Sequence, residues 1–435
     1  MIVSSRNIST DLMKAPIVVS QGFDPAFTSD KEFSFTEFEN SFKAVYPASG
    51  ANSPSFPANN ALKRLVGEGF DVVFVKYNNP SLNIRTQGKN FLEAMNWVAS
   101  KSVPNSSMYL VGPSMGGQVV RSALIEYYDQ KAANNLAVAK TRINGALLFD
   151  SPNLGASIPS SGFFAMRKHS DFDATAKYMT ENMKATAAQQ MLYRAASGDS
   201  WTTNSTAASF YADLNSPNNI RKMTQDGKID IVAISNGSAA GVSQGIPVNT
   251  TYFSGNDQLY RQVIDVPVLG KFTLTGTMST AMTTASASSN SPFTWGLTFA
   301  GMPASYDKTY QTGDSYLENS PGGYRGTFKQ LTDALSSTYS RNVTLNTSVV
   351  NHSFIPTISS LGLTARSLGN SSDLNRAVVA VGNKPQESSI FSRIYAPQVN
   401  QPHVALTYEN AGWMLQEIKW AFAKKQYLGF TSVLN

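Results

Sequence analysis

Short apolar runs alternate with amphipathic segments along the first 150 residues. The apolar runs predict buried strands over residues 15–20, 70–76, 108–111 and 143–149. The amphipathic segments predict helices over residues 57–67, 85–100 and 117–132. Strands that alternate with helices form a mostly parallel sheet covered on both faces. The pattern therefore predicts an α/β fold whose functional site lies beyond the carboxyl ends of the strands.

The pattern changes after Asp150. Residues 157–223 show helical periodicity without strands, which predicts a helical cap over the strand ends, and residues 229–235 return to a buried strand. A long segment rich in Ser, Thr and Gly follows. Its alternation at residues 272–278 and 293–299 predicts strands that pair through the loop at 285–292, and Pro321-Gly-Gly indicates a turn.

An amphipathic helix predicted over residues 407–424 closes the chain. These patterns divide the chain into a core interrupted by two insertions. The predicted parts are residues 1–156 (core, first part), 157–223 (helical cap), 224–238 (core strand), 239–350 (β-rich insertion) and 351–435 (core, C-terminal part).

The turn between the predicted strand at 108–111 and the following helix carries the strongest chemical signal. It contains Gly112-Pro113-Ser114-Met115-Gly116, a G-x-S-x-G pattern. In so sharp a turn, a side chain at Gly112 or Gly116, two positions before or after the serine, would collide with the neighbouring strand or helix. The serine hydroxyl is thereby exposed above the N-terminus of a helix, which favours developing negative charge. Ser114 is the predicted nucleophile.

A serine nucleophile needs a general base, and histidine is the usual one because its pKa lies near the working pH. The chain holds three histidines. His403 precedes the final helix, where a loop after the last strand would bring an imidazole to the strand ends, and we favour it. His352, placed in a loop, remains a second candidate. His169, in a polar stretch of the cap, is better explained as a surface residue.

The acid that orients the imidazole is harder to place. Asp150 ends the strand that follows the Ser114 helix, so its side chain would lie near Ser114, and we rank it first. The alternative explanation for Asp150 is that it forms the turn before Ser151-Pro152. Asp257, in the insertion, is ranked second. Asp230 is not favoured because it lies inside its strand, too far from the end where the site is expected.

An oxyanion needs two backbone N–H groups aimed at one point. The N–H of Met115, directly after the nucleophile, is the expected first donor. The N–H of Phe23, in the turn Gln21-Gly22-Phe23-Asp24-Pro25, is the expected second.

Composition limits the partners. The chain of 435 residues has a net charge of +6, 42% hydrophobic residues and no cysteine. The lack of cysteine excludes disulfides and thiolate chemistry, and we expect neither a cofactor nor a metal. Without a Lys/Arg run, nucleic acid is not an expected partner. No apolar run approaches the length of a membrane span, although peripheral lipid contact stays open.

The low charge and abundant Ser, Thr and Asn favour a secreted or periplasmic protein, with a cytoplasmic one as the alternative.

Three segments together resemble the α/β-hydrolase superfamily, and within it the lipase-like serine esterases. They are the GPSMGG turn, VVSQGFDP with Gln21 at the usual histidine position of the oxyanion loop, and FDSPNLGASIP with Asn153 where histidine is common. The resemblance covers residues 15–160, the strand at 229–238 and residues 400–424. It implies an α/β-hydrolase fold, and the pancreatic-type lipases, whose acid follows the corresponding strand, support Asp150.

These inferences predict a carboxylic ester hydrolase that acts on a small-molecule or lipid ester. Aromatic and methionine residues of the cap suggest an apolar substrate, although most of them are expected to be core residues. They are Phe163, Phe164, Met166, Met191, Leu192 and Tyr193. Two alternatives stay open: an acyltransferase with the same catalytic residues, and a non-catalytic binding protein on a hydrolase scaffold. The oligomeric state is not predicted.

Overall fold

The structure is a computed structural model. It describes residues 2–5, 11–23, 61–133, 141–170, 174–198, 200–224, 228–246, 251–266, 270–283, 291–298, 305–312, 315–326, 329, 344–345 and 351–431. Within these ranges, no helix combines the length and the apolar character that a bilayer span requires.

A central seven-stranded sheet organises the fold, and every pairing in it is parallel except that of the first strand. In spatial order the strands are β1 (Ile2–Ser4), β3 (Asp71–Val75), β2 (Pro16–Ser20), β4 (Met108–Pro113), β5 (Ile143–Phe149), β8 (Asp230–Ile234) and β18 (Arg393–Tyr395). The prediction of an α/β fold with a mostly parallel sheet is confirmed. β1 and β18 were not predicted, because three residues are too few to show a period.

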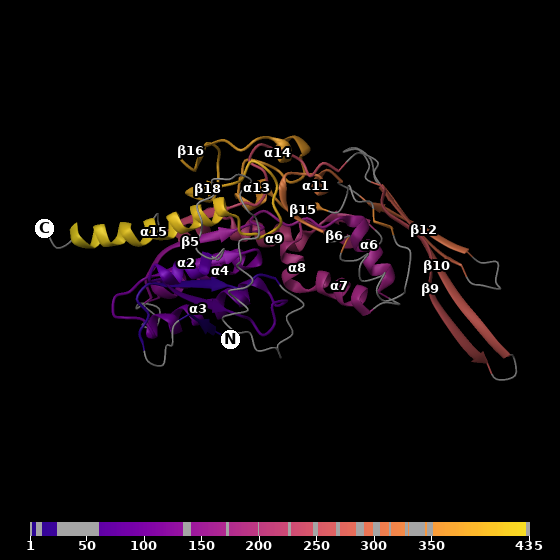
Figure 1. Ribbon diagram of the computed structural model, residues 1–435, viewed down its shortest axis with the longest axis horizontal. Coiled ribbons are helices and arrows are strands. Elements are labelled where there is room, and N and C mark those ends of the chain that lie inside the picture. The colour runs from indigo at the N-terminus through magenta and orange to yellow at the C-terminus, as the bar shows by residue number, and fades with distance from the viewer. Residues whose placement is uncertain are drawn as a thin grey trace.

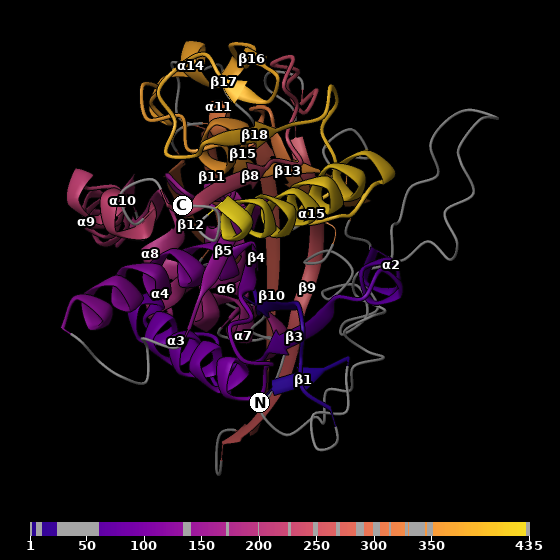
Figure 2. The ribbon, with the colours of Figure 1, turned by 90° about the vertical axis from the view of Figure 1, so that its left-hand side faces the viewer.

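Helices cover both faces of this sheet, as Figures 1 and 2 show. α3 (Ile84–Ser100) and α4 (Met115–Ala132) pack on one face, against side chains such as Val18, Leu110 and Leu148. α2 (Ala61–Gly67) and α15 (Tyr408–Thr431) pack on the other face, against Val19 and Leu147. Successive strand residues thus point to opposite faces, and both sets are buried.

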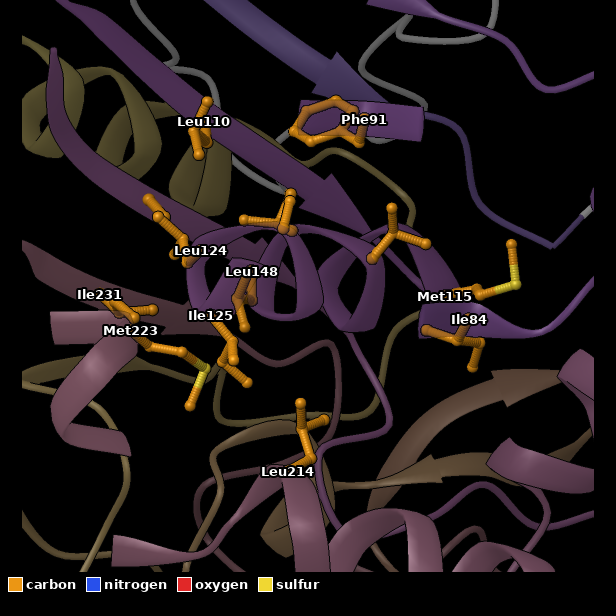
Figure 3. Packing of buried hydrophobic residues seen from close by; sticks show 14 of the residues in the cluster. Ile84, Phe91, Leu110, Met115, Leu124, Ile125, Leu148, Leu214, Met223 and Ile231 are labelled. Carbon is orange, nitrogen blue, oxygen red and sulfur yellow. The ribbon is translucent and has the colours of Figure 1, made fainter. Parts of the chain in front are cut away.

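The core on the α3/α4 face extends to helices that come later in the chain. Leu214 and Met223 join the cluster that contains Leu124 and Ile125 of α4, and Figure 3 shows these side chains together. This packing ties α9 (Ser205–Leu214) and α10 (Pro217–Thr224) to the central sheet.

The predicted cap region is helical but contains a hairpin that was not predicted. Its helices are α6 (Ser160–His169), α7 (Ala174–Lys184), α8 (Thr186–Met191), α9 and α10. The expectation of no strands is wrong, because β6 (Arg194–Ser197) pairs with β7 (Ser200–Thr203). Gly198, at φ +59°, makes the turn between them. RAAS in β6 fits a helix as well as a strand, so its sequence alone is ambiguous.

The next segment contributes a five-stranded antiparallel sheet. Its strands are β9 (Thr251–Val266), β10 (Gly270–Thr283), β11 (Ser291–Thr298), β12 (Ser305–Thr312) and β14 (Thr344–Leu345). β10 and β11 pair at Met282 and Phe293, as their alternation predicted. Figure 1 shows β9 and β10 extending away from the central sheet. The boundaries proposed for the insertions remain predictions.

The remaining elements lie between β12 and α15 along the chain. They are α11 (Ser315–Glu318), β13 (Gly322–Arg325), β15 (His352–Pro356), α13 (Thr357–Ser360), α14 (Ser371–Asn375), β16 (Ala380–Val381) and β17 (Lys384–Pro385). Two expectations fail here. Gly322 and Gly323 belong to a strand rather than a turn, and His352 lies in the strand that pairs with it rather than in a loop.

Candidate active site

Ser114 occupies the tight junction between β4 and α4. β4 ends at Pro113 and α4 begins at Met115, so the serine alone makes the turn, at φ 52° and ψ −130°. Few non-glycine residues adopt this conformation, and holding one there costs about 1–3 kcal/mol. A Cβ on Gly112 would lie 2.5 Å from the Gly117 backbone, and one on Gly116 would lie 2.8 Å from the Ser20 carbonyl oxygen. The close packing predicted around the serine is confirmed, and the helix starts two residues earlier than expected.

Three of the predicted site residues meet at the strand ends. Ser114 Oγ lies 2.9 Å from His403 Nε2, and His403 Nδ1 lies 2.7 Å from Asp150 Oδ2. The imidazole and the carboxylate are both buried. The three side chains form one continuous hydrogen-bonded chain, although His403 is 253 residues from Asp150 along the sequence.

The Asp150 carboxylate is fixed on every side. Its Oδ1 accepts a hydrogen bond from the N–H of Asn236 at 3.0 Å, and its Oδ2 accepts a longer one from the N–H of Val404 at 3.4 Å. Gly323 of β13 approaches so closely that a Cβ there would lie 2.0 Å from Asp150 Oδ2. These contacts explain why glycine stands in the strand, and they shield the carboxylate from water.

The loop that carries His403 is held by backbone and amide contacts. The N–H of His403 donates to the carbonyl of Tyr324 in β13, at 2.8 Å. Asn236 Nδ2 donates to the carbonyls of Pro402 and Ala405, at 2.6 and 3.0 Å. Asn236 was not among the predicted site residues. Its position just after β8 (Asp230–Ile234) was the signal available in the sequence.

The expected oxyanion donors lie next to the serine. Met115 is the first residue of α4, and Phe23 lines the cavity at Ser114. A Cβ on Gly22 would lie 3.9 Å from Ser114 Oγ, so the backbone before Phe23 reaches the nucleophile closely. Gln21 is buried, and its Oε1 accepts a hydrogen bond from the N–H of Tyr77 at 2.9 Å. Gln21 thus ties the loop to the end of β3, whereas Asp24 and Pro25 lie outside the described residues.

A small cavity, lined almost entirely by apolar residues, lies over Ser114. Of the predicted apolar residues, Met191 and Leu192 line it, while Phe163, Phe164 and Met166 lie in the buried cluster that also contains Leu192 and act as core. Tyr193 packs at the edge of the main core. The full lining is Phe23, Ser114, Pro152, Ala156, Met183, Ala188, Met191, Leu192, Arg325, Phe354 and Ile355.

Two of the other candidate residues, His352 and Asp230, have different surroundings. His352 is fully buried in β15, and burial lowers its pKa to about 4. Asp230 begins β8, at the opposite end of the strand from the site, and pairs with Lys424 at 3.1 Å. The side chains of His169 and Asp257 lie outside the described part of the structure. Among the residues described, no group of His, Asp and Glu side chains is arranged to hold a metal ion.

Electrostatics favour a neutral imidazole at His403. Burial lowers the pKa of His403 below its ordinary value of 6.5, and the Arg325 cation lowers it further. The Asp150 carboxylate opposes both effects. A neutral His403 hydrogen-bonded to a serine hydroxyl can accept its proton, which makes the arrangement suitable for nucleophilic catalysis.

No protein-family model and no curated protein matches the chain. The propeptide form of the lipase BlEst2 from Bacillus licheniformis is similar over 55% of this chain and 39% of that chain, with 11% identity and a TM-score of 0.32. Its mature form is similar over 55% of this chain and 72% of that chain, with 11% identity and a TM-score of 0.31. Esterase B from Lactobacillus rhamnosis is similar over 52% of this chain and 56% of that chain, with 14% identity and a TM-score of 0.24. At these values the likeness assigns the chain to no family.

We expect Asp150→Asn to lower kcat for a 4-nitrophenyl ester by about 10³–10⁴-fold, because an amide cannot hold the imidazole in the required tautomer as a carboxylate does. Asp257→Asn is the matched control and should stay within about twofold of wild type. Initial rates with both variants, after circular dichroism has verified their folding, make the comparison. A loss confined to Asp257→Asn would contradict the assignment of the acid.

The pH dependence provides an independent check. Because His403 must be neutral to accept a proton and its pKa is lowered, kcat/KM should rise with pH through an apparent pKa below 6.5. A pH profile of kcat/KM, with circular dichroism at each pH to exclude acid unfolding, measures it. An acid limb centred above 6.5 would be inconsistent with the buried imidazole described here.

Proposed function

We propose that the protein is a carboxylic ester hydrolase of the α/β-hydrolase type that works through a covalent acyl-enzyme. The supporting observation is the continuous chain from Ser114 Oγ through both nitrogens of His403 to Asp150, placed at a strained strand–helix turn. The order of the central strands and the position of the serine after β4 agree with that fold. The proposed substrate is a small-molecule or lipid ester, since the cavity over Ser114 is largely apolar.

In the proposed first half-reaction, Ser114 Oγ attacks the ester carbonyl carbon while His403 Nε2 accepts the hydroxyl proton. The backbone N–H groups of Met115 and Phe23 stabilise the negative oxygen of the tetrahedral intermediate. The intermediate then collapses, the C–O bond to the alcohol breaks, and His403 returns the proton to the departing alkoxide. Ser114 now carries the acyl group.

In the second half-reaction, water takes the place of the alcohol. His403 accepts a proton from the water molecule while the water oxygen attacks the acyl carbon. The bond between the acyl carbon and Ser114 Oγ then breaks, His403 returns the proton to Ser114 Oγ, and the carboxylic acid leaves. Asp150 keeps Nδ1 protonated and stabilises the imidazolium that forms in each half. An acyltransferase would share every step until an acceptor alcohol replaces the water.

We predict that Ser114→Ala lowers kcat/KM for 4-nitrophenyl butyrate by at least about 10³-fold, because the nucleophile is removed while the binding cavity stays intact. Ser100→Ala, at an exposed serine on the end of α3, is the control and should behave as wild type. Product analysis by mass spectrometry with added glycerol separates hydrolysis from acyl transfer. Retained turnover in Ser114→Ala would refute the mechanism, and butyryl-glycerol as the main product would favour the acyltransferase.

A further inference from the structure

Asn236 contacts both the acid and the loop that carries the base. Its backbone N–H donates to Asp150 Oδ1 at 3.0 Å. Its side-chain Nδ2 donates to the carbonyls of Pro402 and Ala405, on either side of His403, at 2.6 and 3.0 Å. The amide must keep its nitrogen toward the loop, because its oxygen in that place would face two other acceptors. Whatever fixes the orientation of this amide therefore also fixes the loop.

Asn410, in the first turn of α15, supplies the contact that fixes it. Asn410 Nδ2 donates to Asn236 Oδ1 at 3.1 Å and to the carbonyl of Ala405 at 3.0 Å. Within the described part of the chain, no other residue donates to Asn236 Oδ1. Both asparagine side chains are fully buried, so an unpaired amide oxygen there would cost free energy that water does not recover. Asn410 thus selects one of the two orientations of the Asn236 amide.

The start of α15 fixes the orientation of Asn410 in turn. The N–H of Thr407 donates to Asn410 Oδ1 at 2.7 Å, and the N–H of Asn410 donates to Thr407 Oγ1 at 3.3 Å. This reciprocal pair is a capping box, in which glutamate or glutamine usually occupies the position of Asn410. A carboxylate there would accept from Thr407 equally well but has no hydrogen to donate to Asn236. The amide therefore serves the loop as well as the helix end.

We propose that Asn410 is a positioning residue for His403 and that it acts through Asn236. This inference rests on the proposed ester hydrolysis at Ser114. The hydrogen bonds run in one direction, from the start of α15 through the two amides to the loop. Asn410 is not among the described residues that line the cavity over Ser114, so its contribution should be to the speed of the reaction and not to substrate binding. A displacement of a catalytic group by about 1 Å can lower the rate about 100-fold.

Two substitutions at position 410 test this role. Asn410→Ala removes the donor, and Asn410→Asp keeps the size and the acceptor for Thr407 but removes the donor while it is ionised. Both should lower kcat for 4-nitrophenyl butyrate by about 10–100-fold. Since His403 acts in both half-reactions, KM should stay within about twofold of wild type. Rates are divided by the amount of reactive Ser114, measured as the final extent of fluorophosphonate labelling, so that an unfolded fraction does not lower the result.

Asn90→Ala and Asn90→Asp, at an exposed asparagine on α3, make the same chemical changes and should behave as wild type. A residue that only fills space at position 410 would leave kcat of Asn410→Asp unchanged, which would overturn the inference. A loss that lies entirely in KM, or circular dichroism showing that neither variant folds, would also overturn it; if one variant folds, that variant decides. These outcomes leave the proposed function intact as long as wild type cleaves the ester and Ser114→Ala does not. Absence of turnover by wild type would overturn both.

Discussion

The site depends on one geometric constraint: a single imidazole must reach the ends of two adjacent strands at once. Pro113 of β4 pairs with Phe149 of β5, so Ser114 and Asp150 leave the sheet side by side. His403 lies between their side chains and hydrogen-bonds to both. Parallel pairing of the two strands therefore sets the distance between Ser114 and Asp150. The loop that carries His403 then places the imidazole between their side chains.

Holding this arrangement has a conformational cost that the surrounding structure must offset. Ser114, Asp150 and Val404 all adopt positive φ, at 52°, 47° and 52°. Such residues persist only where packing and hydrogen bonds over-determine them. Here the sheet fixes the first two, while Asn236 and the backbone of β13 hold the loop that contains Val404. β13 lies far beyond β4 and β5 in the sequence, and its Gly323 also covers the acid, so residues remote in sequence from these strand ends complete the site.

Strong local patterns made the five inner strands of the central sheet, the Ser114 turn and the final helix predictable from sequence. Each buried strand is a run of apolar residues, and the scarcity of histidine favoured His403. Features set by tertiary contacts were missed. Gly322 and Gly323 look like a turn because glycine required for close packing cannot be told from glycine required for a positive φ. The supporting roles of Asn236 and Tyr324 depend on backbone groups that meet only in the folded chain, and Arg325 belongs to no recognisable motif.

The most direct test of the account is whether Ser114 is a reactive nucleophile. Native protein treated with a fluorophosphonate should gain one phosphonyl group, which tandem mass spectrometry should locate on Ser114, and the heat-denatured protein should gain none. His403→Ala should remain unlabelled under the same conditions, because a serine hydroxyl without its base is a poor nucleophile. An unlabelled native protein, or a label on any other serine, would contradict the central claim.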